Sequence, residues 1–248
     1  MKMARLIWRV SVFALPGLLA ACATAPTGGV ARNTSKSFTT VVVDAGHGGK
    51  DNGAYRRFGG AEKVATLDVA KRLERKLRES QLKTVMTRST DVFIPLDQRV
   101  AIENAQKNSI FVSIHFNDSR RRGIHGFETY YHSADSAELA QRIQSKLMTI
   151  PHSANRRVHT ANFRVLRLAA YPAVLVECGF LSNRLEGGEA RDSEYREMLA
   201  DRIAEAIVEQ RYGPGVYHTA AGNAVKPPGE GPNASEGPGL APSSLRRN

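Results

Sequence analysis

The sequence predicts a single α/β domain built on a largely parallel β-sheet with helices on both faces. Strand-like and helix-like periodicities alternate between residues 38 and 212, as they do in chains of βα units. Several of the strands are apolar at every position, which is typical of strands buried on both faces. The length of 248 residues suits one domain with tails, and the sequence contains no internal repeat.

The first predicted unit is a strand followed by a long helix. Residues 39–43 are a β-branched run, and a glycine-rich loop separates them from EKVATLDVAKRLERKLRES, which starts at Glu62. In that stretch Leu67, Leu73 and Leu77 fall on one helical face. The remaining predicted elements are a strand at 83–87, a helix at 96–106, strands at 109–114 and 126–131, a helix at 136–148, a strand at 173–176 and a helix at 194–210.

The N-terminal segment predicts export. Residues 1–21 combine three basic residues with an apolar run that is too short to cross a bilayer, as in a signal peptide. The run ends on Leu-Ala-Ala-Cys22 and resembles the lipobox of bacterial lipoproteins. This resemblance implies a lipidated Cys22 and a periplasmic location with a lipid anchor in the outer membrane. An inner-membrane or soluble periplasmic location, and a plain signal peptide with a chance cysteine, are the alternatives.

The segments that flank the domain have linker-like compositions. Residues 22–37 are rich in Thr, Ser, Gly and Ala, which predicts a flexible tether after the lipidated cysteine. Residues 213–248 are rich in Pro and Gly with few apolar residues, which predicts a disordered tail. The domain itself is therefore expected at 38–212, and we expect it to be a monomer.

The net charge indicates which binding partners are favoured, and the cysteine content indicates whether disulfides form. The formal charge is +11, and the mature chain keeps +8 once the three basic residues of the signal are removed. In an exported protein this charge favours an anionic cell-wall polymer or lipid headgroups and argues against nucleic acid. If Cys22 is acylated, Cys178 has no partner in the chain, which excludes a disulfide framework and favours a small packed residue.

Three apolar strands run into residues with reactive side chains. The strand at 39–43 leads to Asp44 and His47, the strand at 109–114 leads to His115, and the strand at 173–176 leads to Glu177. Because ligands bind outside the carboxyl ends of the strands in open α/β sheets, these side chains are expected to share one crevice. Two histidines and a glutamate there indicate a metal site.

Glu62 is a further candidate ligand. It follows His47 by fifteen residues and begins the long helix, where its ordinary role would be to complement the helix dipole. Two histidines and one carboxylate leave a fourth position of zinc open, which is typical of hydrolytic sites. The intervening glycine-rich loop lacks the spacing of a phosphate-binding loop.

Six motifs in a fixed order carry a family resemblance. The chain resembles the zinc-dependent N-acetylmuramoyl-L-alanine amidases of bacterial cell-wall remodelling (Amidase_3 type) over about residues 38–212. The motifs are VVVDAGHGGKDNGA, GAEK, TRSTDVFIPLDQR, SIFVSIHFN, GFETYY and PAVLVECGFLSN. The resemblance implies a six-stranded sheet, one Zn²⁺ per chain bound by His47, Glu62 and His115, and a catalytic Glu177. It further implies hydrolysis of the amide between N-acetylmuramic acid and L-alanine in peptidoglycan.

The sequence departs from the family pattern at three positions. Ala45 replaces a usual proline, Phe116 an alanine and Asp118 a common serine, which puts substrate fit rather than metal binding in doubt. The domain also has no room for the regulatory helix that some relatives insert.

The mechanism that follows from the resemblance assigns Glu177 as general base toward a zinc-activated water. Asn117 and Asn183 are candidate substrate contacts, although asparagine is also common in turns and at helix caps. Asp44 is expected to be a structural carboxylate rather than a ligand, and Arg99 to pair with an acid. A wall-sugar deacetylase or another zinc hydrolase, and a non-catalytic peptidoglycan-binding lipoprotein, are the alternative functions.

Overall fold

The computed structural model describes residues 33–121 and 123–217. The predicted signal peptide, Cys22, most of the tether and most of the tail lie outside these residues. Within them, residues 33–37 of the expected tether form a turn against the domain, in which Ser35 is buried and its carbonyl accepts a hydrogen bond from Gln210. The described part of the chain contains no helix that combines the length and the apolar character needed to cross a membrane.

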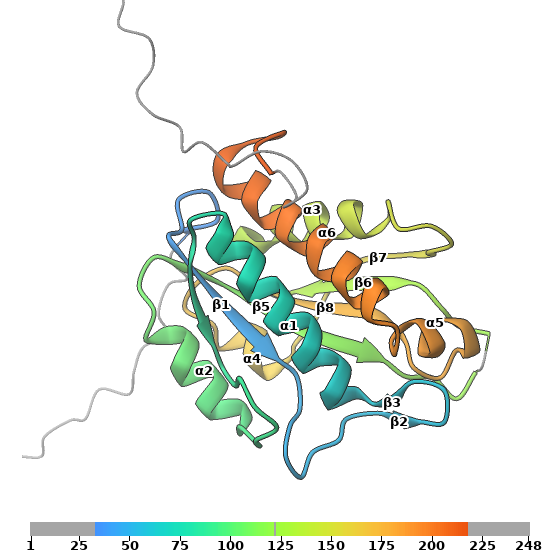
Figure 1. The fold of residues 1–248 in the computed structure, drawn as a ribbon. Coiled ribbons are helices and arrows are strands. Elements are labelled where there is room, and N and C mark those ends of the chain that lie inside the picture. The colour runs from blue at the N-terminus through green and yellow to red at the C-terminus, as the bar shows by residue number, and fades with distance from the viewer. Residues whose placement is uncertain (1–32, 122, 218–248) are drawn as a thin grey trace, which may run out of the picture. The chain divides into compact units, whose positions relative to one another are not determined.

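The described residues fold around a six-stranded sheet, as predicted (Figure 1). Four neighbouring strands are parallel, and β6 runs antiparallel to β8 and parallel to β7. Parallel pairing requires long crossover connections, and the helices supply them. In spatial order the strands are β4 (Lys83–Met86), β1 (Thr40–Ala45), β5 (Ser109–Asn117), β8 (Ala173–Phe180), β6 (Phe127–Tyr131) and β7 (Asn155–Thr160).

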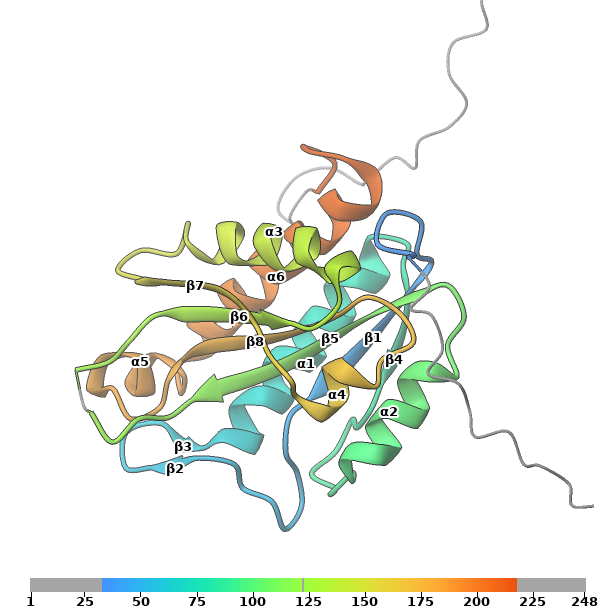
Figure 2. The ribbon, with the colours of Figure 1, turned by 180° about the vertical axis from the view of Figure 1, so that it is seen from behind.

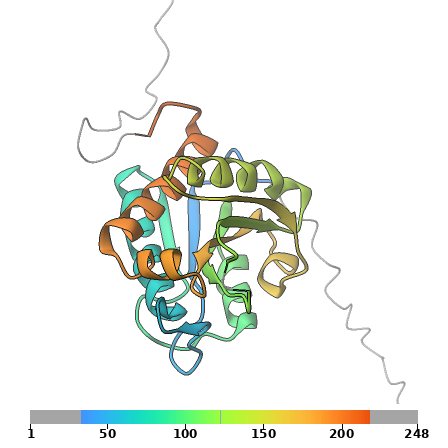
Figure 3. The same cartoon turned by 90° about the vertical axis from the view of Figure 1, so that its right-hand side faces the viewer.

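Helices cover both faces of the sheet. One face carries α1 (Glu62–Glu79), α3 (Ala137–Leu147) and α6 (Ser193–Tyr212), whereas α2 (Leu96–Asn104) and α4 (Arg164–Arg167) cover the other, which faces the viewer in Figure 2. The view of Figure 3 shows the sheet between the two layers. The smaller elements are a hairpin of β2 (Tyr55–Arg56) and β3 (Gly60–Ala61), the turn η1 (Ala134–Ser136) and α5 (Arg184–Glu189).

The alternation of side chains along the strands produces two separate cores. Val42, Phe111 and Leu175 pack with residues of α2 and α4 in the smaller core. Their neighbours Val43 and Val112 point the other way and join the larger core under α1, α3 and α6. Strands buried on both faces need apolar residues at every position, which explains the continuous apolar runs in the sequence.

The same alternation places the reactive residues on one face. Asp44, His115 and Glu177 follow the residues of the smaller core at even spacing along β1, β5 and β8, so they share the α2/α4 face. His115 and Glu177 are partners in the parallel ladder. The predicted strand ends at Ile114 and Val176 were therefore too early, because the backbone ladder continues past both polar residues.

The strand β7 and the short helices α4 and α5 were missed in the sequence. The strand β7 reads NRRVHT and is an edge strand with exposed polar residues, so it lacks an apolar run. The helix α4 is a single turn of four residues, too short to show a helical period.

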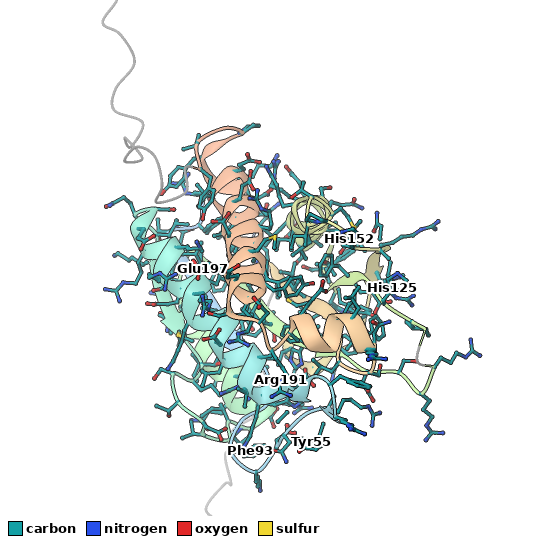
Figure 4. The ribbon with its side chains drawn as sticks, turned by 45° about the vertical axis from the view of Figure 1, so that its right-hand side comes forward. Tyr55, Phe93, His125, His152, Arg191 and Glu197 are labelled. Carbon is teal, nitrogen blue, oxygen red and sulfur yellow. The ribbon has the colours of Figure 1, made fainter. Side chains whose placement is uncertain are left out.

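An ion-pair layer joins α1 to α6. Glu197 of α6, labelled in Figure 4, accepts hydrogen bonds from Arg72 and Arg75 and forms an ion pair with Lys76. Arg72 also donates to Asp68 in its own helix. These pairs are partly exposed, so they fix the contact between the helices more than they raise the stability.

Glu103 of α2 is a buried acid that predicts a pH-dependent stability. Its side chain is fully buried, and neither carboxyl oxygen has a hydrogen-bond partner among the described residues. Burial, with a smaller contribution from Asp44, raises the pKa of Glu103 from 4.5 to about 9. The native protein therefore keeps a proton that the unfolded chain releases in this range, and the stability that this group contributes is lost as the pH rises from about 4.5 to 9.

We expect Glu103→Gln to remove this pH dependence, because the amide copies the neutral acid. Urea unfolding should give equal stability for variant and wild type at pH 4.5. At pH 8.5 the variant should be more stable by several kcal/mol, up to about 5 kcal/mol, because the pKa of Glu103 is raised from 4.5 to about 9. Parallel pH profiles of the two proteins would contradict the assignment.

Candidate metal centre and active site

A cleft of about 750 Å³ opens at the carboxyl ends of the central strands. The arrowheads of β1 and β5 point toward this end of the sheet, where the β2–β3 hairpin also lies (Figure 1). The four residues that the sequence nominated as metal ligands or general base all line it, namely His47, Glu62, His115 and Glu177. The sequence and the topology thus agree on the position of the site, as the rule for open α/β sheets requires.

Two imidazole rings converge on one carboxylate oxygen. Oε1 of Glu62 lies 3.1 Å from Nε2 of His47 and 2.9 Å from Nδ1 of His115. One ligand atom from each of the three residues lies within 4.8 Å of the others. Two neutral nitrogens and one carboxylate oxygen are a donor set for zinc and similar divalent ions, so the three side chains fit a metal ion.

The local backbone brings the three candidate ligand residues together. His47 has a φ of 61°, a left-handed conformation that costs about 1 to 3 kcal/mol in a residue other than glycine. Gly46 precedes it, and a Cβ atom there would lie 2.4 Å from the ring of His115. Glu62 is the first residue of α1, and its Oε2 accepts a hydrogen bond from the backbone N–H of Ala54. The glycine at 46 therefore permits the close approach of the loop to the second histidine.

Asp51 orients the first imidazole and was not nominated by the sequence. Its Oδ2 lies 2.8 Å from Nδ1 of His47, while Oδ1 accepts a hydrogen bond from the N–H of Gly53. A carboxylate on the second ring nitrogen is the usual partner of a metal-binding histidine, because it fixes the ring and leaves the other nitrogen free for the metal. The signal in the sequence was the spacing of four residues in the segment GHGGKD.

The charges of the three candidate ligand residues influence one another strongly. Burial lowers the pKa of His47, but the hydrogen bond and the charge of Glu62 outweigh this effect and raise it to about 9. Burial raises the pKa of Glu62, but the hydrogen bonds and charges of His115 and His47 outweigh this effect. The pKa of Glu62 therefore falls well below its usual range. The pKa of His115 is raised for the same reason as that of His47. The pocket therefore favours positive charge. Protons on the two imidazoles can supply it, and a divalent cation can supply it instead when the imidazoles are neutral.

Glu177 lies beside this cluster with one oxygen uncommitted. Its Oε2 is buried and has no hydrogen-bond partner among the described residues. Burial raises the pKa of Glu177 to about 7, against the opposing charge of His115. A carboxylate with a free oxygen and a pKa near neutrality is suited to take a proton from a water molecule.

Glu128 is a second buried acid next to Glu177 that the sequence did not reveal. The two residues are directly opposite in the antiparallel pair of β6 and β8, so their side chains share a face. Glu128 accepts hydrogen bonds from Asn117 at 2.6 Å, from the hydroxyl of Tyr130 at 2.9 Å and from Arg156 at 2.8 Å. These donors balance its charge, whereas Glu177 keeps an oxygen free.

The two asparagines have different surroundings. Asn117 lines the cleft, but its amide is committed to Glu128, and its carbonyl accepts from the N–H of Asp118. Asn183 caps α5 by accepting hydrogen bonds from Leu185 and Glu186, the role that its position before a helix favours. A direct substrate contact of either residue stays a prediction.

The remaining nominated residues lie as expected. Asp44 and Arg99 form a buried ion pair at 2.5 Å. Cys178 is buried and belongs to the larger core, and burial raises the pKa of its thiol. Of the three departures from the family pattern, Asp118 pairs with Arg56 at the rim of the cleft, and Phe116 is buried.

Comparison with known proteins agrees with this geometry. Residues 41–209 match the N-acetylmuramoyl-L-alanine amidase family, Amidase_3. The N-acetylmuramoyl-L-alanine amidase LytC of Bacillus subtilis (strain 168) is 36% identical over 173 residues, which are 68% of this chain and 35% of LytC. YqiI, an uncharacterized protein of the same strain, is 36% identical over 210 residues, 82% of this chain and 97% of YqiI. The chain thus spans about a third of the length of LytC and nearly all of YqiI.

Solved structures show the same fold. The amidase AmiC2 of Nostoc punctiforme superposes with a TM-score of 0.67 at 35% identity, covering 68% of this chain and 95% of AmiC2. The catalytic domain of the amidase CwlV from Bacillus (Paenibacillus) polymyxa var. colistinus gives a TM-score of 0.66 at 37% identity, with coverage of 69% and 97%. From the matched motifs, the superposed folds and the convergent ligand residues together, it follows that this chain belongs to the N-acetylmuramoyl-L-alanine amidase family.

Proposed function

We propose that this protein is a zinc hydrolase that cleaves the amide between the lactyl group of N-acetylmuramic acid and L-alanine in peptidoglycan. The observation that carries the proposal is the convergence of His47, Glu62 and His115 beside Glu177 in an open cleft of a family member. All four side chains come from one chain, so the reaction needs no second copy of the protein.

In this mechanism His47, Glu62 and His115 hold the zinc ion. Bound there, zinc supplies a Lewis acid for the scissile carbonyl and makes a water molecule acidic at neutral pH. Glu177 takes a proton from the water while the oxygen of that water attacks the carbonyl carbon. Glu177 then gives the proton to the nitrogen of L-alanine as the C–N bond breaks. The products are a carboxylate on the lactyl group and a stem peptide with a free amino terminus.

The cleft has an apolar wall that suits the bulk of such a substrate. Phe93, Leu96 and Phe163 line it and are each about two-fifths to one-half exposed. Exposed aromatic rings beside a polar site are typical of pockets that bind part of a ligand by apolar contact. This wall supports a bulky glycopeptide substrate over a small soluble one.

The test is product analysis of purified peptidoglycan digested with the purified protein, with and without a chelator. We expect intact stem peptides with new amino termini, and no products after chelation. Acetate release with the stem peptides still attached would instead identify a deacetylase. Binding without any release would identify a non-catalytic peptidoglycan-binding protein.

We further propose that the mature protein is anchored at the periplasmic side of the outer membrane through lipidated Cys22. The lipobox-like end of the signal segment supports this location. The mass of the N-terminal peptide from membrane fractions is the measurement that tests it. A peptide that begins before or after Cys22 without acyl groups would contradict the anchor.

A further inference from the structure

Arg99 of α2 binds the loop that carries the first histidine. Its Nη1 donates to the carbonyl of Ala45 at 2.6 Å and to Asp44 at 2.5 Å, and its Nη2 donates to the carbonyl of His47 at 2.6 Å. Its Nε donates to the carbonyl of Ile94 at 3.0 Å, and only 3% of the residue is exposed. Four of the five N–H groups of this guanidinium are therefore committed, two of them to backbone oxygens at the end of β1 and in the loop that follows it.

Arg88 binds the same loop from a second direction. Its Nε donates to the carbonyl of Ala45 at 2.9 Å, and its Nη2 donates to the carbonyl of Gly46 at 2.7 Å. Nη2 also lies 3.0 Å from the carbonyl of Lys63 and 3.1 Å from the hydroxyl of Thr66, which itself donates to Gly46. The two arginines together bind three consecutive carbonyl groups, and Arg88 connects them to the first turn of α1.

Asp44 links Arg99 to the strand that carries the second histidine. Its Oδ1 accepts from Arg99 and from the hydroxyl of Thr87, and its Oδ2 accepts from the hydroxyl of Ser113 at 2.6 Å. Ser113 lies two residues before His115 in β5 and points to the same face. The carboxylate is buried and fully paired, so it resists displacement.

One buried network thus contacts the segments of all three metal ligands. It binds His47 through its own carbonyl, Glu62 through its neighbour Lys63, and His115 through Ser113. We propose that Arg99, Arg88 and Asp44 are positioning residues that hold the three ligands in place before the metal arrives. The left-handed conformation of His47 needs such support, because an isolated loop would relax to a more extended backbone.

Positioning of this kind acts on metal affinity. A ligand set that is already in place loses less conformational freedom when it binds, so its dissociation constant is lower. Loss of a group that hydrogen-bonds to a metal-binding residue typically weakens metal binding by about 10 to 100-fold. The inference rests on the proposed zinc centre, yet zinc affinity is measured without peptidoglycan, so a failure of the proposed amidase reaction would remain distinguishable.

The test replaces each arginine by lysine in the full chain. Lysine keeps the positive charge beside Asp44 but lacks the planar fork that reaches several carbonyl groups at once. We expect Arg99→Lys and Arg88→Lys to bind zinc about 10 to 100-fold more weakly in competition with a chromophoric chelator. The visible spectrum of bound Co²⁺ should also change, because the ligand geometry is altered.

A matched control separates positioning from a general loss of stability. Arg72→Lys makes the same chemical change in a residue that bonds Asp68, Glu197 and Ser193, away from the cleft. It should lower the melting temperature of the metal-free protein but leave the zinc affinity and the Co²⁺ spectrum unchanged. If Arg99→Lys does not fold, Thr66→Val removes the bond to Gly46 and one acceptor of Arg88 with little change of shape, and it should weaken zinc binding to a smaller extent.

Wild-type zinc affinity and an unchanged Co²⁺ spectrum in the folded arginine variants would overturn the proposal. Equal losses of zinc affinity in Arg72→Lys and Arg99→Lys would do the same, because they would trace the effect to stability alone.

Discussion

Glu177→Gln should retain zinc and lose turnover by about 10² to 10⁴-fold, the usual contribution of a general base. The glutamine has nearly the same volume and keeps a polar group toward the cleft, so the fold and the three metal ligands stay in place. It cannot take a proton from water at neutral pH. Metal content, melting temperature and the rate of stem-peptide release, measured on the same preparation, check this result.

Glu103→Gln is the matched control for that variant. Burial raises the pKa of both glutamates, but Glu103 is a buried residue of α2 and does not line the cleft. We expect full activity in Glu103→Gln. If Glu177→Gln kept wild-type activity, the general base would have to be sought among other acids of the site.

His115→Ala should abolish stoichiometric zinc binding and all activity. In the proposed zinc centre the ring is one of three protein ligands, and its loss leaves Glu62 and His47 without the partner that completes the donor set. In the wild type a chelator should lower the melting temperature, because bound metal stabilises only the folded state, by about 4 kcal/mol at a thousandfold excess over its dissociation constant. In the variant the chelator should have no effect.

The control for this variant is His132→Ala. His132 is exposed and bonds the carbonyl of Ala161, outside the cleft lining. It should keep the metal content and the chelator response of the wild type. Stoichiometric zinc in His115→Ala would show that the ligand set is wrong.

The residues at the ends of the apolar strands were predictable because periodicity and topology act on them directly. An apolar run that ends in Asp44, His115 or Glu177 reveals both a strand and the edge at which its last side chain lies. Even spacing along each strand then decides which face these side chains share. The regular alternation of side chains along the strands therefore makes the positions of these residues predictable from the sequence.

The supporting residues were not predictable in the same way. Glu128 and Arg88 make their key contacts with segments far away in the chain, and their positions depend on which strands become neighbours. The pairing of Arg99 with an acid was expected, but its bond to the carbonyl of His47 was not. Nothing in a local pattern distinguishes a buried arginine that binds carbonyl groups from one on a solvated helix. Likewise, β7 lacks an apolar period because it pairs on one side only.

That edge strand has a consequence for how the protein behaves at high local concentration. Arg157 has a φ of 75°, and the pairing register of β6 with β7 shifts between Phe127 and Thr129, so the edge is bulged as well as charged. Bulges and cationic side chains prevent another molecule from adding its own strand to an open ladder. Crowded copies of this domain are therefore protected on this side from intermolecular sheet growth and the aggregation that follows from it.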